Sequence, residues 1–209
     1  MRNENDEIDE LTKIIIIGEQ AVGKSSLISR YCNGEFDFNM IGTAGVDFRK
    51  KVLKIESNIV NLIIFDTAGQ QRYRSITKYF YQGCKGVILV FDTSELITFT
   101  NLKDWLQTIQ QNTDIGIQIL LVANKIDLPR QVSTEQGKSF AEEVNLSIIE
   151  TSAKTGFNVE KAFETLIRKI IIYENEDKNK KERENENNRK NIDIEKNKKK
   201  DSVSCCGKG

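Results

Sequence analysis

The chain has 209 residues, with 31 basic and 31 acidic side chains and an apolar share of 38%. This length predicts one domain with room for a tail. Histidine is absent, which excludes Ser–His–Asp and Cys–His catalysis, His-ligated zinc and a histidine pH switch. No apolar stretch reaches the roughly 18 residues that a membrane-spanning helix needs. The four cysteines lack the spacing of a zinc site or a secreted disulfide framework, so we expect a reduced, cytosolic setting.

Composition divides the chain into three segments. Residues 1–10 are polar and acidic, and we expect a flexible N-terminus. Residues 11–173 alternate between strand-like and helix-like patterns and predict the folded domain. Residues 174–209 are rich in Asn, Glu and Lys and cannot bury enough surface to offset the entropy of ordering, which predicts a disordered tail. A fraying extension of the preceding helix is compatible with the first part of that tail.

The folded segment predicts an α/β fold, because strand and helix patterns alternate along it. Continuous apolar runs predict buried parallel strands, and two strands joined by a short polar turn predict a hairpin. The strand candidates are residues 13–17, 46–54, 59–65, 87–91, 118–122 and 147–150. Helical patterns begin at Lys24, recur from Phe99 to Ile109 and recur again from Val159 to Ile170. We expect a six-stranded, mostly parallel sheet with one antiparallel edge strand and helices on both faces. Ligands bind such sheets at the carboxyl ends of the strands.

A phosphate-binding loop follows the first strand. The segment 18–25 reads GEQAVGKS, which is G-x-x-x-x-G-K-S between a strand and a helix, as the motif requires. Two glycines let the backbone turn its N–H groups inward, and the helix dipole adds to the anion site. We expect Lys24 to contact the β- and γ-phosphates and Ser25 to bind Mg²⁺. The loop alone does not select between ATP and GTP. The predicted nucleotide contacts here are Gly18, Glu19, Gln20, Ala21, Val22, Gly23, Lys24, Ser25 and Ser26.

Two later motifs predict selectivity for guanine. Residues 124–127 read NKID after a buried strand, and the Asp127 carboxylate can accept hydrogen bonds from guanine N1–H and the 2-amino group. Adenine would leave this carboxylate unpaired. Lys125 can lie across the base, and Asn124 can join the loops. Residues 150–154 read ETSAK, where the Ala153 N–H could donate to guanine O6. The predicted base contacts are Asn124, Lys125, Asp127, Leu128, Ser152, Ala153 and Lys154.

The ordered motifs point to a known family. Residues 66–70 read DTAGQ at the end of the third strand, where Asp66 is placed to support Mg²⁺. Together with GEQAVGKS, GVDF, NKID and ETSAK, this set resembles the Ras-like small GTPases and, among them, the Rab proteins. The resemblance covers residues 11–173 and the last five. It implies a P-loop NTPase-type three-layer fold and a GTP/GDP switch that hydrolyses GTP with Mg²⁺ and regulates vesicle trafficking.

The resemblance also implies residue roles. Thr43 would bind Mg²⁺ and the γ-phosphate, and Gly69 would donate to the γ-phosphate. Gln70 would orient the attacking water, and Lys24 would neutralise phosphate charge. Phe36 would pack edge-on to guanine. Val46, Phe48, Phe65 and Phe80 would face effectors. The departures Ala44, Gln71, Phe65 and Phe80 from the usual Ile, Glu, Trp and Tyr leave the identity of the effector open.

The resemblance further implies how the protein is located and regulated. Cys205 and Cys206 look like a double-prenylation site, and residues 196–200 would meet an anionic membrane rather than nucleic acid. The implied partners are an exchange factor, a GTPase-activating protein, a Rab escort protein, a dissociation inhibitor and effectors. We expect a monomeric GTPase domain at the cytoplasmic face of an endomembrane, cycling with the cytosol. The Gln20 loop resembles that of a Golgi-acting subgroup.

Two alternative functions stay open at this point. One is a Ras-like signalling GTPase, against which the Cys-Cys terminus argues. The other is a nucleotide-locked scaffold with negligible hydrolysis. Gln20 beside the γ-phosphate favours this second alternative, whereas Gln70 and Thr43 argue against it.

Overall fold

The computed structural model describes residues 11–38, 43, 45–67 and 80–204, and from 184 to 204 it describes the backbone alone. The strands are β1 Thr12–Gly18, β2 Val46–Ile55, β3 Asn58–Thr67, β4 Gly86–Asp92, β5 Gln118–Asn124 and β6 Ser147–Glu150. The helices are α1 Lys24–Asn33, α3 Leu96–Thr100, α4 Leu102–Asn112, α5 Thr134–Glu143 and α6 Val159–Ser204.

The strands form one six-stranded sheet in the order β2-β3-β1-β4-β5-β6. Neighbours are parallel except β2 and β3, which form the expected hairpin, with Val46 opposite Thr67 and Ile55 opposite Asn58. The predicted fold class is therefore confirmed, including the antiparallel edge strand. The carboxyl ends of β1, β3, β4 and β5 lie at one edge of the sheet, and the motifs of the candidate site begin there.

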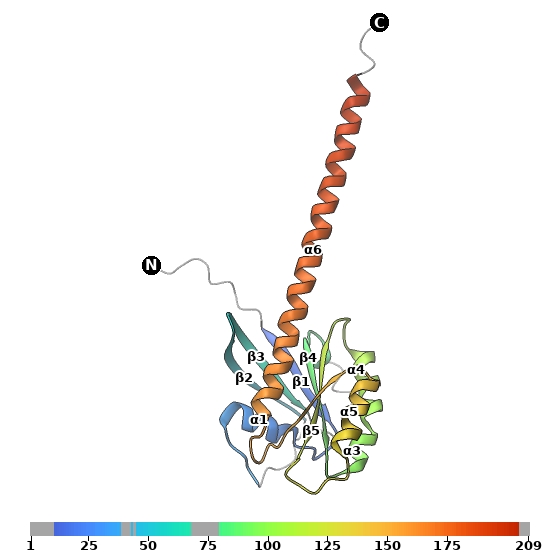
Figure 1. The fold of residues 1–209 in the computed structure, drawn as a ribbon. Helices are drawn as coiled ribbons and strands as arrows, with labels where there is room; N and C mark the ends of the chain where they lie inside the picture. Colours follow the sequence, from blue (N-terminus) through green and yellow to red (C-terminus); the bar gives the residue numbers. More distant parts are fainter. Residues whose placement is uncertain (1–10, 39–42, 44, 68–79, 205–209) are drawn as a thin grey trace, which may run out of the picture. The chain divides into compact units, whose positions relative to one another are not determined.

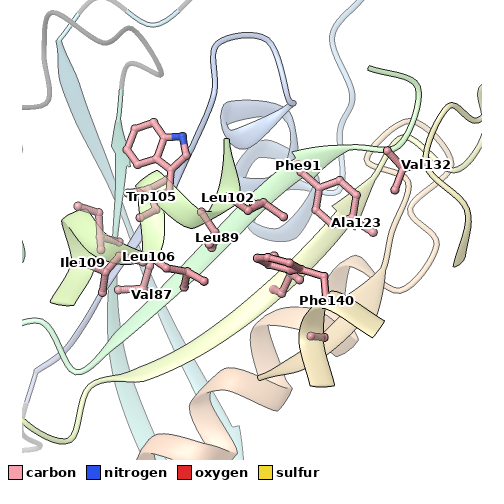
Figure 2. Packing of buried hydrophobic residues seen from close by; sticks show 14 of the residues in the cluster. Val87, Leu89, Phe91, Leu102, Trp105, Leu106, Ile109, Ala123, Val132 and Phe140 are labelled. Atoms are coloured by element: carbon pink, nitrogen blue, oxygen red, sulfur yellow. The ribbon is translucent and has the colours of Figure 1, made fainter. Parts of the chain in front are cut away.

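Helices cover both faces of the sheet (Figure 1). The four isoleucines of β1, Ile14 to Ile17, are fully buried, which explains why this run is continuously apolar. On one face, Leu102, Leu106 and Ile109 of α4 pack on β4 and β5 (Figure 2). On the other face lie α1 and the first turns of α6, where Tyr31 and Phe163 stack with their ring centroids 4.1 Å apart.

The helices between β4 and β6 differ from the sequence prediction in two places. The pattern from Phe99 to Ile109 is split at Asn101, which ends α3 and begins α4. Helix α5 was not singled out in the sequence, although Ser133 and Gln136 form a capping box at its start. That motif is a recognisable signal for a helix N-terminus, so α5 was predictable.

The chain divides after Ile170 into two compact units. In the second unit, α6 is helical as far as Ser204. The tail from residue 174 was predicted to be disordered, with a fraying extension of the preceding helix compatible with its first part. Glu, Lys and Arg have high helix propensity, and pairs such as Asp177 and Lys181, 2.6 Å apart, add local support. In the part of the chain that the structure describes, no helix combines the length and apolarity needed to cross a bilayer.

Candidate functional site

The loop after β1 can be formed only with glycine at two positions. Gly18 and Gly23 have positive φ angles of +141° and +96°. A Cβ at Gly18 would lie 2.1 Å from the Val90 carbonyl oxygen, and one at Gly23 would lie 2.4 Å from Asn124 Nδ2. Helix α1 begins at Lys24, so the free N–H groups and the positive dipole end of α1 face the loop. The loop therefore offers an anion site at the carboxyl end of β1.

Lys24 supplies a buried cation to this anion site. Its Nζ donates to the Gly18 and Glu19 carbonyl oxygens at 3.1 Å and 2.8 Å. Burial lowers the pKa of Lys24 to about 8, against the raising effect of Asp66 and Glu19. The side chain is thus still mainly cationic at neutral pH, and its burial strengthens any interaction with a phosphate.

The Glu19 side chain anchors the loop to the neighbouring helix. Glu19 Oε1 accepts hydrogen bonds from Trp105 Nε1 at 3.1 Å and from Asn101 Nδ2 at 3.2 Å. Glu19 was predicted only as a nucleotide contact, and its side chain has this second, structural role. The next residue, Gln20, is exposed.

Three oxygen-bearing side chains predicted to bind Mg²⁺ lie together beside Lys24. Ser25 Oγ lies 2.6 Å from Thr43 Oγ1, which lies 3.4 Å from Asp66 Oδ2. Burial raises the pKa of Asp66, against the lowering effect of Ser25, Lys24 and Thr43. Asp66 Oδ1 is buried and accepts no hydrogen bond from any described residue. A hard cation would satisfy this oxygen, so the set fits Mg²⁺.

A cavity of about 330 Å³ lies beside the phosphate loop and between the guanine motifs. Most of its lining residues were predicted from the sequence, and Asp37 and Phe38 were not. The lining residues are Ala21, Gly23, Ser26, Phe36, Asp37, Phe38, Asn124, Lys125, Asp127, Leu128, Ala153 and Lys154.

Hydrogen bonds join the loops around this cavity. Asn124 Nδ2 donates to the Val22 carbonyl at 2.8 Å, and Asn124 Oδ1 accepts from the Ala153 N–H at 3.2 Å. Asn124 thus holds the loops together, as predicted, although its acceptor takes the N–H that was predicted for guanine O6. Asp127 Oδ1 accepts from the Ser152 hydroxyl at 2.6 Å, which orients the carboxylate.

The comparisons with known proteins agree with this geometry. A model of the Ras family matches residues 13–172. The chain is 43% identical over 171 residues to the Ras-related protein RABA2a of Arabidopsis thaliana, covering 81% of this chain and 79% of the relative. It is 44% identical over 168 residues to RABA1f of the same plant, covering 79% of this chain and 77% of the relative.

This chain belongs to the Rab family of Ras-like small GTPases. Members of this family bind guanine nucleotides and hydrolyse GTP, so the chain is a GTPase. A role in vesicle trafficking is typical of Rab proteins.

A row of aromatic rings crosses β2, β3 and the segment before β4 of this Rab protein. The Phe48 and Phe65 centroids are 6.1 Å apart, and the Phe65 and Phe80 centroids are 5.5 Å apart. Only Phe48 is largely exposed, because Phe65 and Phe80 pack partly against the core. Phe65 and Phe80 keep partial exposure, and the prediction that the three rings face effectors stays a prediction. Val46 begins β2 beside this row.

Sequence reasoning missed several residues around the nucleotide site of this Rab protein. Asp92 pairs with Lys125 at 2.6 Å, and Phe38 lies edge-on to Phe36 with centroids 5.0 Å apart. Arg30 donates to backbone carbonyls of the loop after β6. The bonds of Arg30 span more than 120 positions and end on backbone atoms, so no local motif reveals them.

Several predicted residues lie outside the described part of this Rab protein. They are Gly69 and Gln70, the departures Ala44 and Gln71, the lipid-site cysteines Cys205 and Cys206, and the N-terminal residues 1–10.

Proposed function

We propose that this Rab GTPase binds GDP and GTP with the base in the 330 Å³ cavity and the phosphates on the Gly18–Ser25 loop. The observation that carries the proposal is the position of Asp127. Its carboxylate lines the cavity and is held by Ser152, on the loop that also presents Ala153. A base with two adjacent N–H donors and a neighbouring acceptor fits that arrangement, and guanine has all three.

The other lining residues set the position of the base. Asn124 fixes the distance between the phosphate loop and the guanine motifs by bonding both. Lys125, held at its ammonium group by Asp92, can cover one side of the base with its aliphatic stem. Phe36 and Phe38 lie at the cavity wall and can exclude water from the base.

The phosphate end supplies charge and position rather than covalent chemistry. Lys24 would turn its ammonium from the loop carbonyls to the β- and γ-phosphates. Ser25, Thr43 and Asp66 would hold Mg²⁺, which supplies positive charge to the phosphate oxygens when it is bound. Gln70 would orient the attacking water, and Thr43 and Gly69 would sense the γ-phosphate. Intrinsic turnover is expected to be slow and to be accelerated by a GTPase-activating protein.

The membrane part of the proposal rests on the tail. Prenyl groups on both Cys205 and Cys206 would anchor the protein stably, because one lipid chain alone gives only marginal binding. Lysines among residues 196–200 would add attraction to anionic lipids. An escort protein would present the chain for prenylation, and a dissociation inhibitor would return it to the cytosol. Val46 and the aromatic row would face effectors at the endomembrane surface.

The test of base recognition is the Asp127→Asn substitution, with Asp104→Asn on the exposed surface of α4 as control. Charged hydrogen bonds contribute about 1.5–3 kcal/mol each, so GDP binding should weaken roughly 100-fold or more. Preference should shift towards xanthosine diphosphate, which presents an oxygen in place of the 2-amino group. Competition against a fluorescent GDP measures both effects. Equal affinity of the unmutated protein for GDP and ADP would contradict the proposal.

Single-turnover phosphate release from bound GTP separates a working switch from a locked scaffold. A switch releases phosphate in one slow exponential phase. A scaffold keeps GTP intact over the same period.

A further inference from the structure

Arg30 connects the helix of the phosphate site to the loop of the base site. It lies in the last turn of α1, and all three of its guanidinium nitrogens donate to backbone carbonyls. Nε donates to Ala153 at 2.9 Å, Nη2 to Lys154 at 2.8 Å and Nη1 to Gly34 at 2.6 Å. The guanidinium is a rigid planar fork, so one side chain fixes all three carbonyls relative to one another.

The bond to Gly34 fixes Arg30 itself. Gly34 caps α1 in the left-handed conformation and donates its N–H to the Arg30 carbonyl at 3.0 Å. Arg30 thus donates to the Gly34 carbonyl through its side chain and accepts from the Gly34 N–H through its own carbonyl. These two bonds hold the Arg30 side chain at the end of α1. The guanidinium is therefore held in one position by hydrogen bonds rather than moving freely at the surface.

The other two bonds orient the loop that faces the base. The carbonyls of Ala153 and Lys154 belong to two successive peptide planes, and both residues line the base cavity. The Gly156 N–H closes the same loop by donating to the Ser152 carbonyl at 2.9 Å, and a Cβ at Gly156 would lie 3.7 Å from Arg30 Cδ. The Arg30 stem therefore lies along a tight turn that includes two cavity-lining residues. The Ala153 N–H belongs to the peptide plane just before the two that Arg30 bonds, and it donates to Asn124 Oδ1 at 3.2 Å.

The two sides of the base site have different anchors. Ser152 supports Asp127, which recognises the N1–H and 2-amino side of guanine under the proposed function. Within the described part of the chain, Arg30 has no bond to Asp127. It bonds the two peptide planes that follow the one carrying the Ala153 N–H, so under the proposed function it would set the direction of this N–H, shared between Asn124 Oδ1 and guanine O6, through the adjoining backbone. Removing Arg30 should therefore disturb recognition of O6 and leave recognition of the 2-amino group in place.

We propose that Arg30 is a positioning residue for guanine O6, acting through the backbone of residues 153 and 154. This inference rests on the proposed function, because it assumes that guanine occupies the cavity. The substitutions Arg30→Ala and Arg30→Lys test it in the full chain. Arg168→Ala is the control, because Arg168 on α6 pairs with the Glu56 and Glu164 carboxylates and not with this loop.

The readout is the affinity of each protein for three diphosphates, measured by competition against fluorescent GDP with Mg²⁺ present. In 6-thio-GDP the O6 acceptor is replaced by sulfur, a poor acceptor, while N1–H and the 2-amino group remain. Inosine diphosphate lacks the 2-amino group and keeps O6. The ratio of GDP to 6-thio-GDP affinity reports the Ala153 contact, and the ratio of GDP to inosine diphosphate affinity reports the Asp127 contact.

Arg30→Ala should lower the affinity for GDP about tenfold, which is the effect of losing one hydrogen bond to a charged group. It should remove most of the preference for GDP over 6-thio-GDP and leave the preference over inosine diphosphate unchanged. Arg30→Lys should fall between this variant and the wild type, because an ammonium cannot bond all three carbonyls in the same geometry. Arg168→Ala should match the wild type in both ratios.

Three results would overturn the inference. An unchanged 6-thio-GDP ratio in Arg30→Ala would show that Arg30 does not position the O6 contact. An equal fall in both ratios would show a general loosening of the site. If Arg30→Ala does not yield folded protein, the same two criteria apply to Arg30→Lys. A wild-type protein that distinguishes neither analogue from GDP would instead refute the proposed function itself, and with it the inference.

Discussion

The substitution Glu19→Ala would cut the link between the phosphate loop and α4. Glu19 Oε1 accepts from the Trp105 indole and from Asn101, and Trp105 is 3% exposed. With the carboxylate gone, these bonds to Trp105 and Asn101 would be lost. We therefore expect the folded state to be destabilised and the phosphate loop to become less rigid.

The size of the effect follows from the two lost bonds. A hydrogen bond to a charged group contributes about 1.5–3 kcal/mol when it is buried. Glu19 is only half-buried, so the lower end of the range applies, and we expect a loss of about 2–3 kcal/mol in the free energy of unfolding. Glu19→Gln keeps an oxygen acceptor and should recover at least half of this loss.

The protein carries its own probe for the assay. Trp105 is its one tryptophan, so intrinsic fluorescence reports the residue that donates to Glu19. Urea unfolding at a fixed excess of GDP and Mg²⁺ gives the free energy difference once the nucleotide contribution, RT ln(1 + [GDP]/Kd), has been subtracted for each protein from its own measured Kd. Glu142→Ala, at an exposed position of α5, is the matched control.

A loss below about 0.5 kcal/mol for Glu19→Ala, the range of ordinary surface substitutions, would refute this reasoning. So would Glu19→Gln behaving like Glu19→Ala while Glu142→Ala behaves like the wild type. The acceptor oxygen would then be irrelevant to the link.

Four further predictions follow from the site, the core and the tail. Ser25→Asn should weaken the binding of GTP more than that of GDP and reduce the dependence of binding on Mg²⁺, because an amide replaces the hydroxyl beside Thr43. A Mg²⁺ titration of nucleotide affinity tests this. Gln70→Leu should slow single-turnover phosphate release at least tenfold while leaving GTP affinity intact. Burial raises the pKa of the Cys84 thiol from 9.0 to about 12. The folded state therefore favours the protonated thiol; this contribution to the free energy of unfolding is complete below pH 9 and is lost as the pH rises towards 12. Cys84→Ala should flatten the fall in the free energy of unfolding over that interval. Replacing both Cys205 and Cys206 with serine should move the protein to the soluble fraction without changing hydrolysis, and a double variant that still pellets with membranes would contradict prenyl anchoring.

The sheet could be predicted because its signals are local. The isoleucines of β1 and the apolar runs of β4 and β5 are buried on both faces, which requires continuous apolar sequence. The hairpin followed from two strands and a short turn. The break at Asn101 could not be predicted from apolar spacing, because Phe99 and Leu102 keep helical spacing across it.

The site was predictable where a motif fixes the chemistry and unpredictable where folding fixes the contact. Gly18, Lys24 and Asp127 are constrained by a phosphate or a base, so short patterns reveal them. The side-chain partners of Glu19 and the loop carbonyls that Arg30 bonds lie 82 to 124 positions away. Those partners are common side chains or backbone atoms, so only the folded chain shows the pairing.

These long-range contacts make the phosphate loop and α1 the centre of the whole site. Asn124 reaches the loop through the Val22 carbonyl, Glu19 joins the loop to α4, and Arg30 joins α1 to the residues that face the base. The Asn124 and Glu19 bonds hold the phosphate loop itself, whereas the Arg30 bonds hold the end of α1 against residues 153 and 154. Burial lowers the pKa of Lys24, so a phosphate anion beside its ammonium group would stabilise the charged form. The phosphate loop is joined through Val22 and Asn124 to the Ala153 N–H, so the residues proposed to hold the phosphates and those proposed to hold the base are connected parts of one site.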